Sequence, residues 1–288
     1  MPAADLTPRS SPGDTPLERS PWRQVNIHCA DQTAAERMGV AVLGPVLYRA
    51  ETAGLVTSWF FVRKGQWWRV RLRPTPSAGQ EAQAHLTTAL TSGQTGGQLF
   101  RWVETIYEPE IHAFGGAEGM DTAHALFHAD SRHMLDYLAS DRASAPGRGD
   151  QRRELSILLC SAFLRAAGLD WYEQGDVWAR VAEHRPSEQE LPQHRIRTLA
   201  PALRRLMTVE AGSASPLVDG GPLTFAAGWV AAFERAGARY RSLAAEGRLN
   251  RGLRAVCAHH LLFHFNRLGL AYQVQAVLAA AGRELVFI

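Results

Sequence analysis

The sequence predicts an α+β fold: a ferredoxin-like β-α-β-β-α-β antiparallel sheet unit followed by a helical C-terminal half. Two observations carry this prediction. Strand-like stretches rich in β-branched and aromatic residues occur before residue 116, where they alternate with two helix-like stretches. Beyond that point, helical patterns continue to the end of the chain. We expect a sheet unit at 21–116 and a helical part at 117–288 to pack as one compact domain.

The elements of the sheet unit are expected in this order along the chain. Strands are predicted at 22–28, 55–62, 67–73 and 98–107. The first helix begins after Asp31, which can cap it, is kinked by Pro45 and ends at Gly54. The second helix is short and is expected around 82–90. In the C-terminal half, helices are predicted at 120–140, 151–168, 171–184, 190–210, 223–246 and 250–282.

The composition is that of an ordinary globular protein. Hydrophobic residues make up 46% of the chain and charged residues 20%, which is enough for a core. The net charge of +3 argues only weakly for an anionic ligand. The three cysteines are far apart, without metal-binding spacing, and suit a reducing compartment. Residues 1–20 read as a disordered tail without the apolar run of a secretory signal, so we expect a cytoplasmic protein.

The third predicted strand places arginines on one side. Arg69, Arg71 and Arg73 alternate with Trp68, Val70 and Leu72, and Arg63 lies on the neighbouring strand. Arginine forks bind carboxylates and phosphates with two hydrogen bonds, so this face can hold an anionic ligand. The alternative is a charged outer face that only meets water.

Acids, a histidine and two glycines gather where the strand pattern gives way to the helix pattern. Glu108 and Glu110 lie two residues apart, so both would point to the same side of an extended segment. His112 follows, and Gly115-Gly116 gives the backbone unusual freedom. A carboxylate beside a basic residue can act as a general acid or base. The alternative is a strand exit whose acids face water.

Two helices carry histidines. His124 and His128 share a face of one helix, but no third ligand is defined, so we expect no metal, and these histidines to line a polar groove or pack in a core. On the predicted helix 250–282, His260, His264 and Arg267 form a stripe on a mostly apolar segment. Basic side chains on a buried helix need partners. We expect these to be Glu108 and Glu110, and the alternative is a purely structural ion-pair network.

These segments resemble the elimination domain of class I lanthipeptide dehydratases, above all its free-standing form in thiopeptide and goadsporin-type pathways. Around Glu110 the family reads Tyr-x-x-Glu-x-x-Arg-Tyr-Gly-Gly, and Glu110 matches its Glu. Asn266-Arg267 match the pair that ends the family's last motif, and Arg69 and Arg71 match its third strand. Three positions depart from the pattern: Trp68 replaces a His, Ala113 the Arg, and Leu262 another His.

The resemblance implies that the protein eliminates glutamate from glutamylated Ser or Thr in a ribosomally made precursor peptide, giving dehydroalanine or dehydrobutyrine. It implies a glutamyl-tRNA-dependent glutamylating partner protein and no cofactor, and we expect neither a membrane nor direct nucleic-acid contact. The expected catalytic residues are His264, His260, Glu110, Arg69 and Arg71. The expected substrate-binding residues are Arg63, Glu108, His112, His124, Asn266 and Arg267.

Two other functions stay open at this point. Pyridine synthases of thiopeptide pathways share the family resemblance, and they join two dehydroalanines by a formal [4+2] cycloaddition and then release the leader peptide. The segment Gln66-Trp-Trp-Arg69 differs from the strand expected of those enzymes, which favours elimination. The chain can also be a non-catalytic subunit that binds peptide, a function that the departures at Ala113 and Leu262 would fit.

Overall fold

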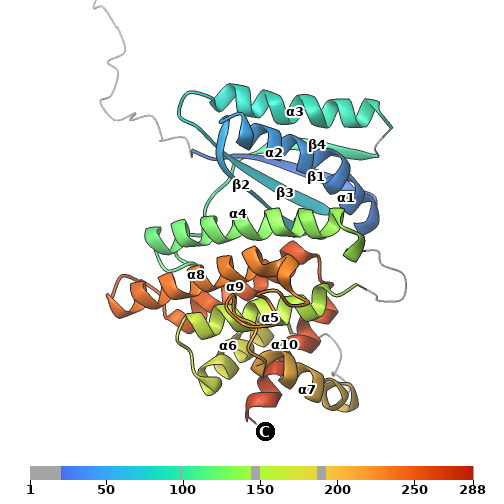
Figure 1. Cartoon of the computed structure of the whole chain (residues 1–288). Coiled ribbons are helices and arrows are strands. Elements are labelled where there is room, and N and C mark those ends of the chain that lie inside the picture. The colour runs from blue at the N-terminus through green and yellow to red at the C-terminus, as the bar shows by residue number, and fades with distance from the viewer. Residues whose placement is uncertain (1–20, 98, 144–149, 187–192, 288) are drawn as a thin grey trace, which may run out of the picture.

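The computed structural model describes residues 21–97, 99–143, 150–186 and 193–287, so the predicted tail at 1–20 lies outside the described residues. Four strands form one antiparallel sheet in the order β2-β3-β1-β4. The strands are β1 (Arg23–Cys29), β2 (Val56–Lys64), β3 (Trp67–Pro74) and β4 (Phe100–Thr105). This strand order, with helices after β1 and β3, confirms the predicted ferredoxin-like unit (Figure 1).

One face of the sheet is covered by the helices of the same unit (Figure 1). They are α1 (Gln32–Met38), a π-helical segment (Gly39–Leu43), α2 (Gly44–Thr52) and α3 (Gly79–Thr95). Asp31 caps α1 as predicted, by accepting a hydrogen bond from the backbone of Ala34. Pro45, where a kink was expected, stands in the first turn of α2, directly after the π-helical segment that interrupts the predicted single helix.

The helical half lies on the other side of the sheet, below it in Figure 1. Its helices are α4 (Ala117–Ala139), α5 (Arg152–Ala166), α6 (Trp171–Glu183), α7 (Gln193–Thr208), α8 (Ala227–Ala245), α9 (Leu253–Leu268) and α10 (Tyr272–Phe287). The prediction of one helix over 250–282 was wrong. Gly269 adopts a left-handed conformation with φ 73° and ends α9, so that α10 begins three residues later.

The edge strand β2 connects the sheet to the helical half through hydrogen bonds. Its outer backbone groups meet side chains instead of a fifth strand. The backbone N–H of Phe61 donates to Ser131 Oγ (3.1 Å), and its carbonyl accepts from Arg267 Nε (3.1 Å). His128 Nδ1 lies 2.9 Å from the carbonyl oxygen of Trp59. The polar groups of an exposed edge would otherwise invite pairing with another chain, and here α4 and α9 satisfy them.

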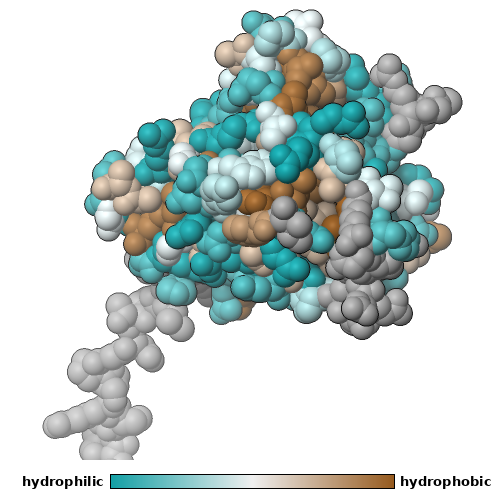
Figure 2. Space-filling model, turned by 90° about the horizontal axis from the view of Figure 1, so that it is seen from below, coloured by the Kyte–Doolittle hydropathy of each residue, from teal (hydrophilic) through white to brown (hydrophobic). Residues whose placement is uncertain are grey.

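Two clusters of buried side chains form the interior. The larger runs from the helix-covered face of the sheet into the C-terminal helices, and the smaller lies around Phe60, Phe114 and Phe127, between β2 and α4. On the face seen in Figure 2, apolar patches alternate with hydrophilic residues. Within the described residues, no helix is both long and apolar enough to span a bilayer.

Candidate active site

A cavity of about 730 Å³ lies between the tip of the β2–β3 hairpin and the junction of α9 and α10. Its walls come from parts of the chain that are far apart in sequence. Those used below are Arg69, Arg71, Glu110, Arg185, Asn266, Tyr272 and Gln275. Arg69 and Arg71 therefore lie at a cavity that residues of α9 and α10 also line.

The sheet forms one wall of this cavity, and Arg71 is its most constrained cation. Only 7% of Arg71 is exposed, and its Nε donates to Gln24 Oε1 (2.7 Å). The guanidinium carbon lies 4.6 Å from the centre of the Tyr107 ring. Burial, together with the field of Arg69, lowers the pKa of Arg71 to about 10, so the side chain stays protonated at neutral pH. Arg69, on the same side of β3, is half-buried.

The opposite wall carries a cation that the sequence analysis missed. Arg185 lies just after α6, where its Nε donates to Gln275 Oε1 (2.8 Å) and its Nη2 to Asn266 Oδ1 (3.3 Å). Its guanidinium carbon lies 5.4 Å from the centre of the Tyr272 ring. No spacing in the sequence connects a residue after α6 with α9 and α10, so nothing in the chain pointed to it.

Glu110 supplies a carboxylate to the cavity. It stands at the start of a turn that leads into α4, and 56% of its side chain is exposed. Gly115 (φ 86°) and Gly116 (φ 106°) take up the left-handed backbone that this turn needs, as their sequence suggested. Glu108 and His112, by contrast, are exposed and do not line the cavity.

Arg63 does not join the arginine face. Arg63 on β2 pairs with Trp68 on β3. The two side chains therefore share one face of the sheet, and Arg69 lies on the opposite face. Its Nη1 donates to Glu36 Oε1 (2.7 Å), and its guanidinium stacks 4.4 Å from the Trp68 ring centre. Arg63 also lines the cavity, but its charge is already matched by the carboxylate of Glu36.

The stripe on α9 forms a buried network, but not with the acids expected. Asp130 of α4 accepts from His264 Nδ1 (2.9 Å), from Arg267 Nη1 and from Trp229 Nε1 (2.7 Å). The expected partners, Glu108 and Glu110, were wrong, since Asp130 faces α9 from the middle of α4. Burial alone would raise the pKa of Asp130, but His264 and Arg267 outweigh it and hold that pKa below its usual value.

The remaining predicted histidines are also enclosed. His260 is 3% exposed, lies 4.9 Å from the ring centres of Phe114 and Tyr240, and has a pKa lowered to about 3, first by burial and then by Arg267. His124 hydrogen-bonds the Tyr107 hydroxyl (2.9 Å), and burial lowers its pKa to about 4. Neither histidine lines the cavity, and nor does His264. Within the described residues, no three potential metal ligands of the His, Cys, Asp or Glu type cluster together.

The positions that depart from the resembled motifs have clear surroundings. Leu262 is buried in the core, 5% exposed. The carbonyl of Ala113 accepts a hydrogen bond from Arg251 Nη1 (2.9 Å), so a guanidinium from another loop approaches the position of the missing arginine. Asn266 has a defined task, because its side-chain oxygen accepts from both Arg185 and Gln275.

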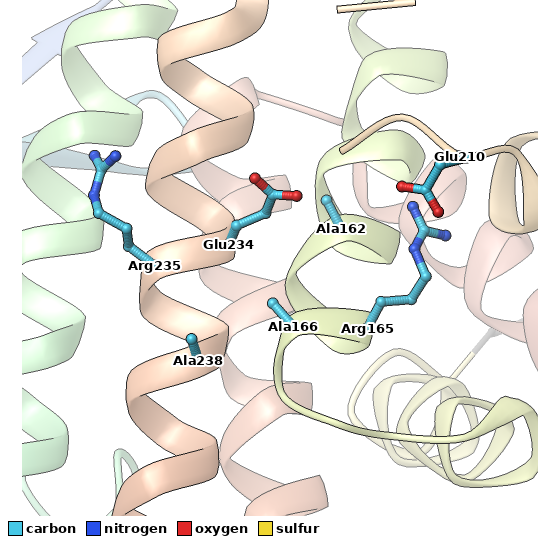
Figure 3. Close-up of a pocket in the computed structure, with 7 residues that line it drawn as sticks. All are labelled: Ala162, Arg165, Ala166, Glu210, Glu234, Arg235 and Ala238. Atoms are coloured by element: carbon cyan, nitrogen blue, oxygen red, sulfur yellow. The ribbon is translucent and has the colours of Figure 1, made fainter. Parts of the chain in front are cut away.

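A second, smaller cavity of about 400 Å³ lies between α5 and α8 (Figure 3). Its acids are already engaged: Glu234 accepts from the backbone of Ser213 and Glu210 from that of Gly212. Figure 3 shows Arg165 and Glu210 pointing toward each other, while Arg235 points away from the other polar groups. These groups hold the loop that follows α7, so this cavity is the weaker candidate for a site.

The fold is similar to those of three solved structures. MibB, a tRNA dependent lantibiotic dehydratase from Microbispora sp. 107891, is 19% identical with a TM-score of 0.63. The alignment covers 98% of this chain but 29% of MibB. TsrL is 15% identical with a TM-score of 0.63, over 93% of this chain and 95% of TsrL. TbtD, the pyridine synthase from thiomuracin biosynthesis, is 13% identical with a TM-score of 0.54, over 92% of this chain and 97% of TbtD.

At these identities the three likenesses establish the fold alone. No curated protein matches the chain. The family evidence comes from the sequence itself, because residues 22–286 match the family described as lantibiotic biosynthesis dehydratase C-term. That match spans nearly the whole chain, and the protein therefore belongs to the family of lantibiotic dehydratase C-terminal domains.

Proposed function

We propose that this protein eliminates glutamate from glutamylated Ser or Thr residues of a ribosomally made precursor peptide, leaving dehydroalanine or dehydrobutyrine. One observation carries the proposal: Arg69, Arg71 and Arg185 line one cavity, and none has a carboxylate within 4.0 Å in the described part of the chain. The leaving group is a carboxylate with a second carboxylate attached. A cationic cavity stabilises the negative charge that develops as this group departs.

The elimination needs a base for the α-proton of the modified residue, while the Cβ–O bond breaks and glutamate leaves. Glu110 is our candidate for that base, since Asp31, the other carboxylate that lines the cavity within the described residues, caps α1. His264 and His260, the proton carriers expected from the sequence, are enclosed by protein. We assign His264 to holding Asp130 and Arg267, and through them the α4–α9–β2 junction.

The substrate and partner follow from this chemistry. We propose that the glutamylated peptide is supplied by a glutamyl-tRNA-dependent glutamylating partner protein. The chain spans 29% of the length of MibB, a tRNA dependent lantibiotic dehydratase. The elimination itself needs only a base, a cationic cavity and the peptide, so we propose no cofactor.

Incubation of the protein with a glutamylated peptide, followed by mass spectrometry, tests the proposal. We expect the dehydrated peptide and free glutamate. Conversion of a fully dehydrated azole peptide into a macrocycle plus leader, with no glutamate release from the glutamylated peptide, would instead establish a pyridine synthase. Peptide binding without either product would indicate the non-catalytic subunit that Ala113 and Leu262 leave open.

A further inference from the structure

The arginines of this protein fall into two groups according to their partners. Arg63 and Arg152 are matched by the carboxylate of Glu36, and Arg267 is matched by that of Asp130. Arg185 differs, because its hydrogen-bond partners are neutral oxygens of Gln275, Asn266 and the His184 backbone. Among the residues that the structure describes, no carboxylate therefore balances its positive charge at the wall of the cavity.

Two amide side chains fix the guanidinium of Arg185. Gln275 is 3% exposed, accepts from Arg185 Nε, and donates to the Leu270 carbonyl (2.7 Å) and to Asn266 Oδ1 (3.2 Å). Asn266 Oδ1 in turn accepts from Arg185 Nη2. A guanidinium has five N–H donors, and three of them are used in these contacts. Within the described residues, one N–H on each terminal nitrogen thus has no partner, and two such N–H groups can bind a carboxylate with two hydrogen bonds.

The opposite wall already offers Arg69 and Arg71 to one carboxylate. The leaving group of the proposed reaction carries two, and two carboxylates held in one cavity need two cationic positions. We propose that Arg185 binds the second carboxylate of the departing glutamate and so selects a dicarboxylic leaving group. This inference rests on the proposed function and extends it to specificity, with Asn266 and Gln275 as the residues that position Arg185.

The discrimination between glutamate and glutamine measures this role directly. Glutamine has the same shape, with an uncharged amide in place of the second carboxylate. We would titrate L-glutamate and L-glutamine calorimetrically into the parent protein, the Arg185→Gln variant and a matched control, Arg254→Gln. Arg254 is a half-exposed arginine at the start of α9 that pairs with Asp176 and lies outside the cavity.

We expect Arg185→Gln to bind glutamate about tenfold or more weakly, because a charge-assisted contact is lost, and to bind glutamine within about twofold of the parent. Arg254→Gln should keep the parent's preference for glutamate. The ratio of the two affinities does not depend on the folded fraction, so a general loss of structure cannot mimic the result.

Two outcomes would overturn the inference, and they differ in meaning. If the parent releases glutamate from a glutamylated peptide but Arg185→Gln keeps the same glutamate-to-glutamine ratio, Arg185 has no part in specificity and the proposed function stands. If the parent neither binds glutamate nor releases it from the peptide, the proposed function fails and the inference fails with it.

Discussion

Two carboxylates of this protein have different surroundings. One is enclosed by the protein, and the other is open to a cavity that arginines line. Asp130 is 0% exposed and is held by Arg267, His264 and Trp229 at the junction of α4, α8 and α9. Glu110 is more than half exposed and lines the same cavity as Arg69 and Arg71. A charge that is paired inside the protein stabilises the fold, whereas a charge that is open to a cavity is available to a ligand.

Replacement of Glu110 by Gln should give the largest effect, and it should fall on the rate. Removing a general base slows a reaction by about 10²–10⁴-fold, so kcat for glutamate elimination should drop by that order. Stability should change by less than about 0.5 kcal/mol, because the side chain is exposed. Single-turnover assays and chemical denaturation measure the two quantities.

Glu108→Gln is the matched control, since Glu108 lies two residues away and outside the cavity. It should react like the parent. An equal loss of rate in both variants would mean that the segment, and not the cavity, determines activity.

Replacement of Asp130 by Ala should show the reverse behaviour. Breaking a buried pair leaves an uncompensated charge on Arg267 and typically costs about 3–5 kcal/mol of unfolding free energy. Urea or guanidinium denaturation followed by circular dichroism would measure it. A variant as stable as the parent would show that this network is not what joins α9 to the sheet.

The arginines of the cavity should have a smaller effect, again on activity. Arg69→Ala and Arg71→Ala should each raise the activation free energy for elimination by about 1.5–3 kcal/mol, the worth of a charge-assisted hydrogen bond. Free glutamate should inhibit the parent and inhibit these variants less.

Arg73→Ala provides the control on the same strand and the same face, because Arg73 is exposed and does not line the cavity. Equal losses in all three variants, measured as kcat/KM on a glutamylated peptide, would argue against a specific anion site.

The parts of the site that depend on residues close in sequence could be predicted, and the parts that depend on contacts between distant residues could not. Local alternation was enough to place Arg69 and Arg71 on one face, and the glycines predicted the turn after Glu110. Partner choice was not predictable, because Asp130 meets His264 only through the packing of α4 on α9. Arg185 could not be predicted as a site residue, since its hydrogen-bond partners Asn266 and Gln275 lie more than 80 residues away in sequence.

The same limit explains the errors in the fold. Periodicity extended one helix across Gly269, where a single left-handed residue turns the chain. It also put Arg63 with the other arginines, although the strand register, which sequence does not give, pairs it with Trp68. Whether a segment forms a helix or a strand was predictable from its local pattern. Which side chains of neighbouring strands share a face of the sheet was not.

The smallest expected effect is on the pH dependence of the unfolding free energy, and it comes from the buried His260. The pKa of His260 is lowered from 6.5 to about 3, mainly by burial, with Arg267 and His259 lowering it further and Asp130 opposing them. In the unfolded chain this histidine takes up a proton below about pH 6.5, whereas the folded protein keeps it neutral. Acidification from pH 7 to pH 5 therefore favours the unfolded state, by about 2 kcal/mol for this one group.

Comparison of the parent with His260→Leu isolates that contribution, since other histidines titrate equally in both proteins. The unfolding free energy of the variant should fall less between pH 7 and pH 5, by roughly the same 2 kcal/mol. Above pH 7 the two curves should run parallel, because His260 is then neutral in both states. Identical pH dependence over the whole range would mean that His260 takes up its proton in the folded protein too, as an open, proton-exchanging site would, and would return it to the list of candidates for the base.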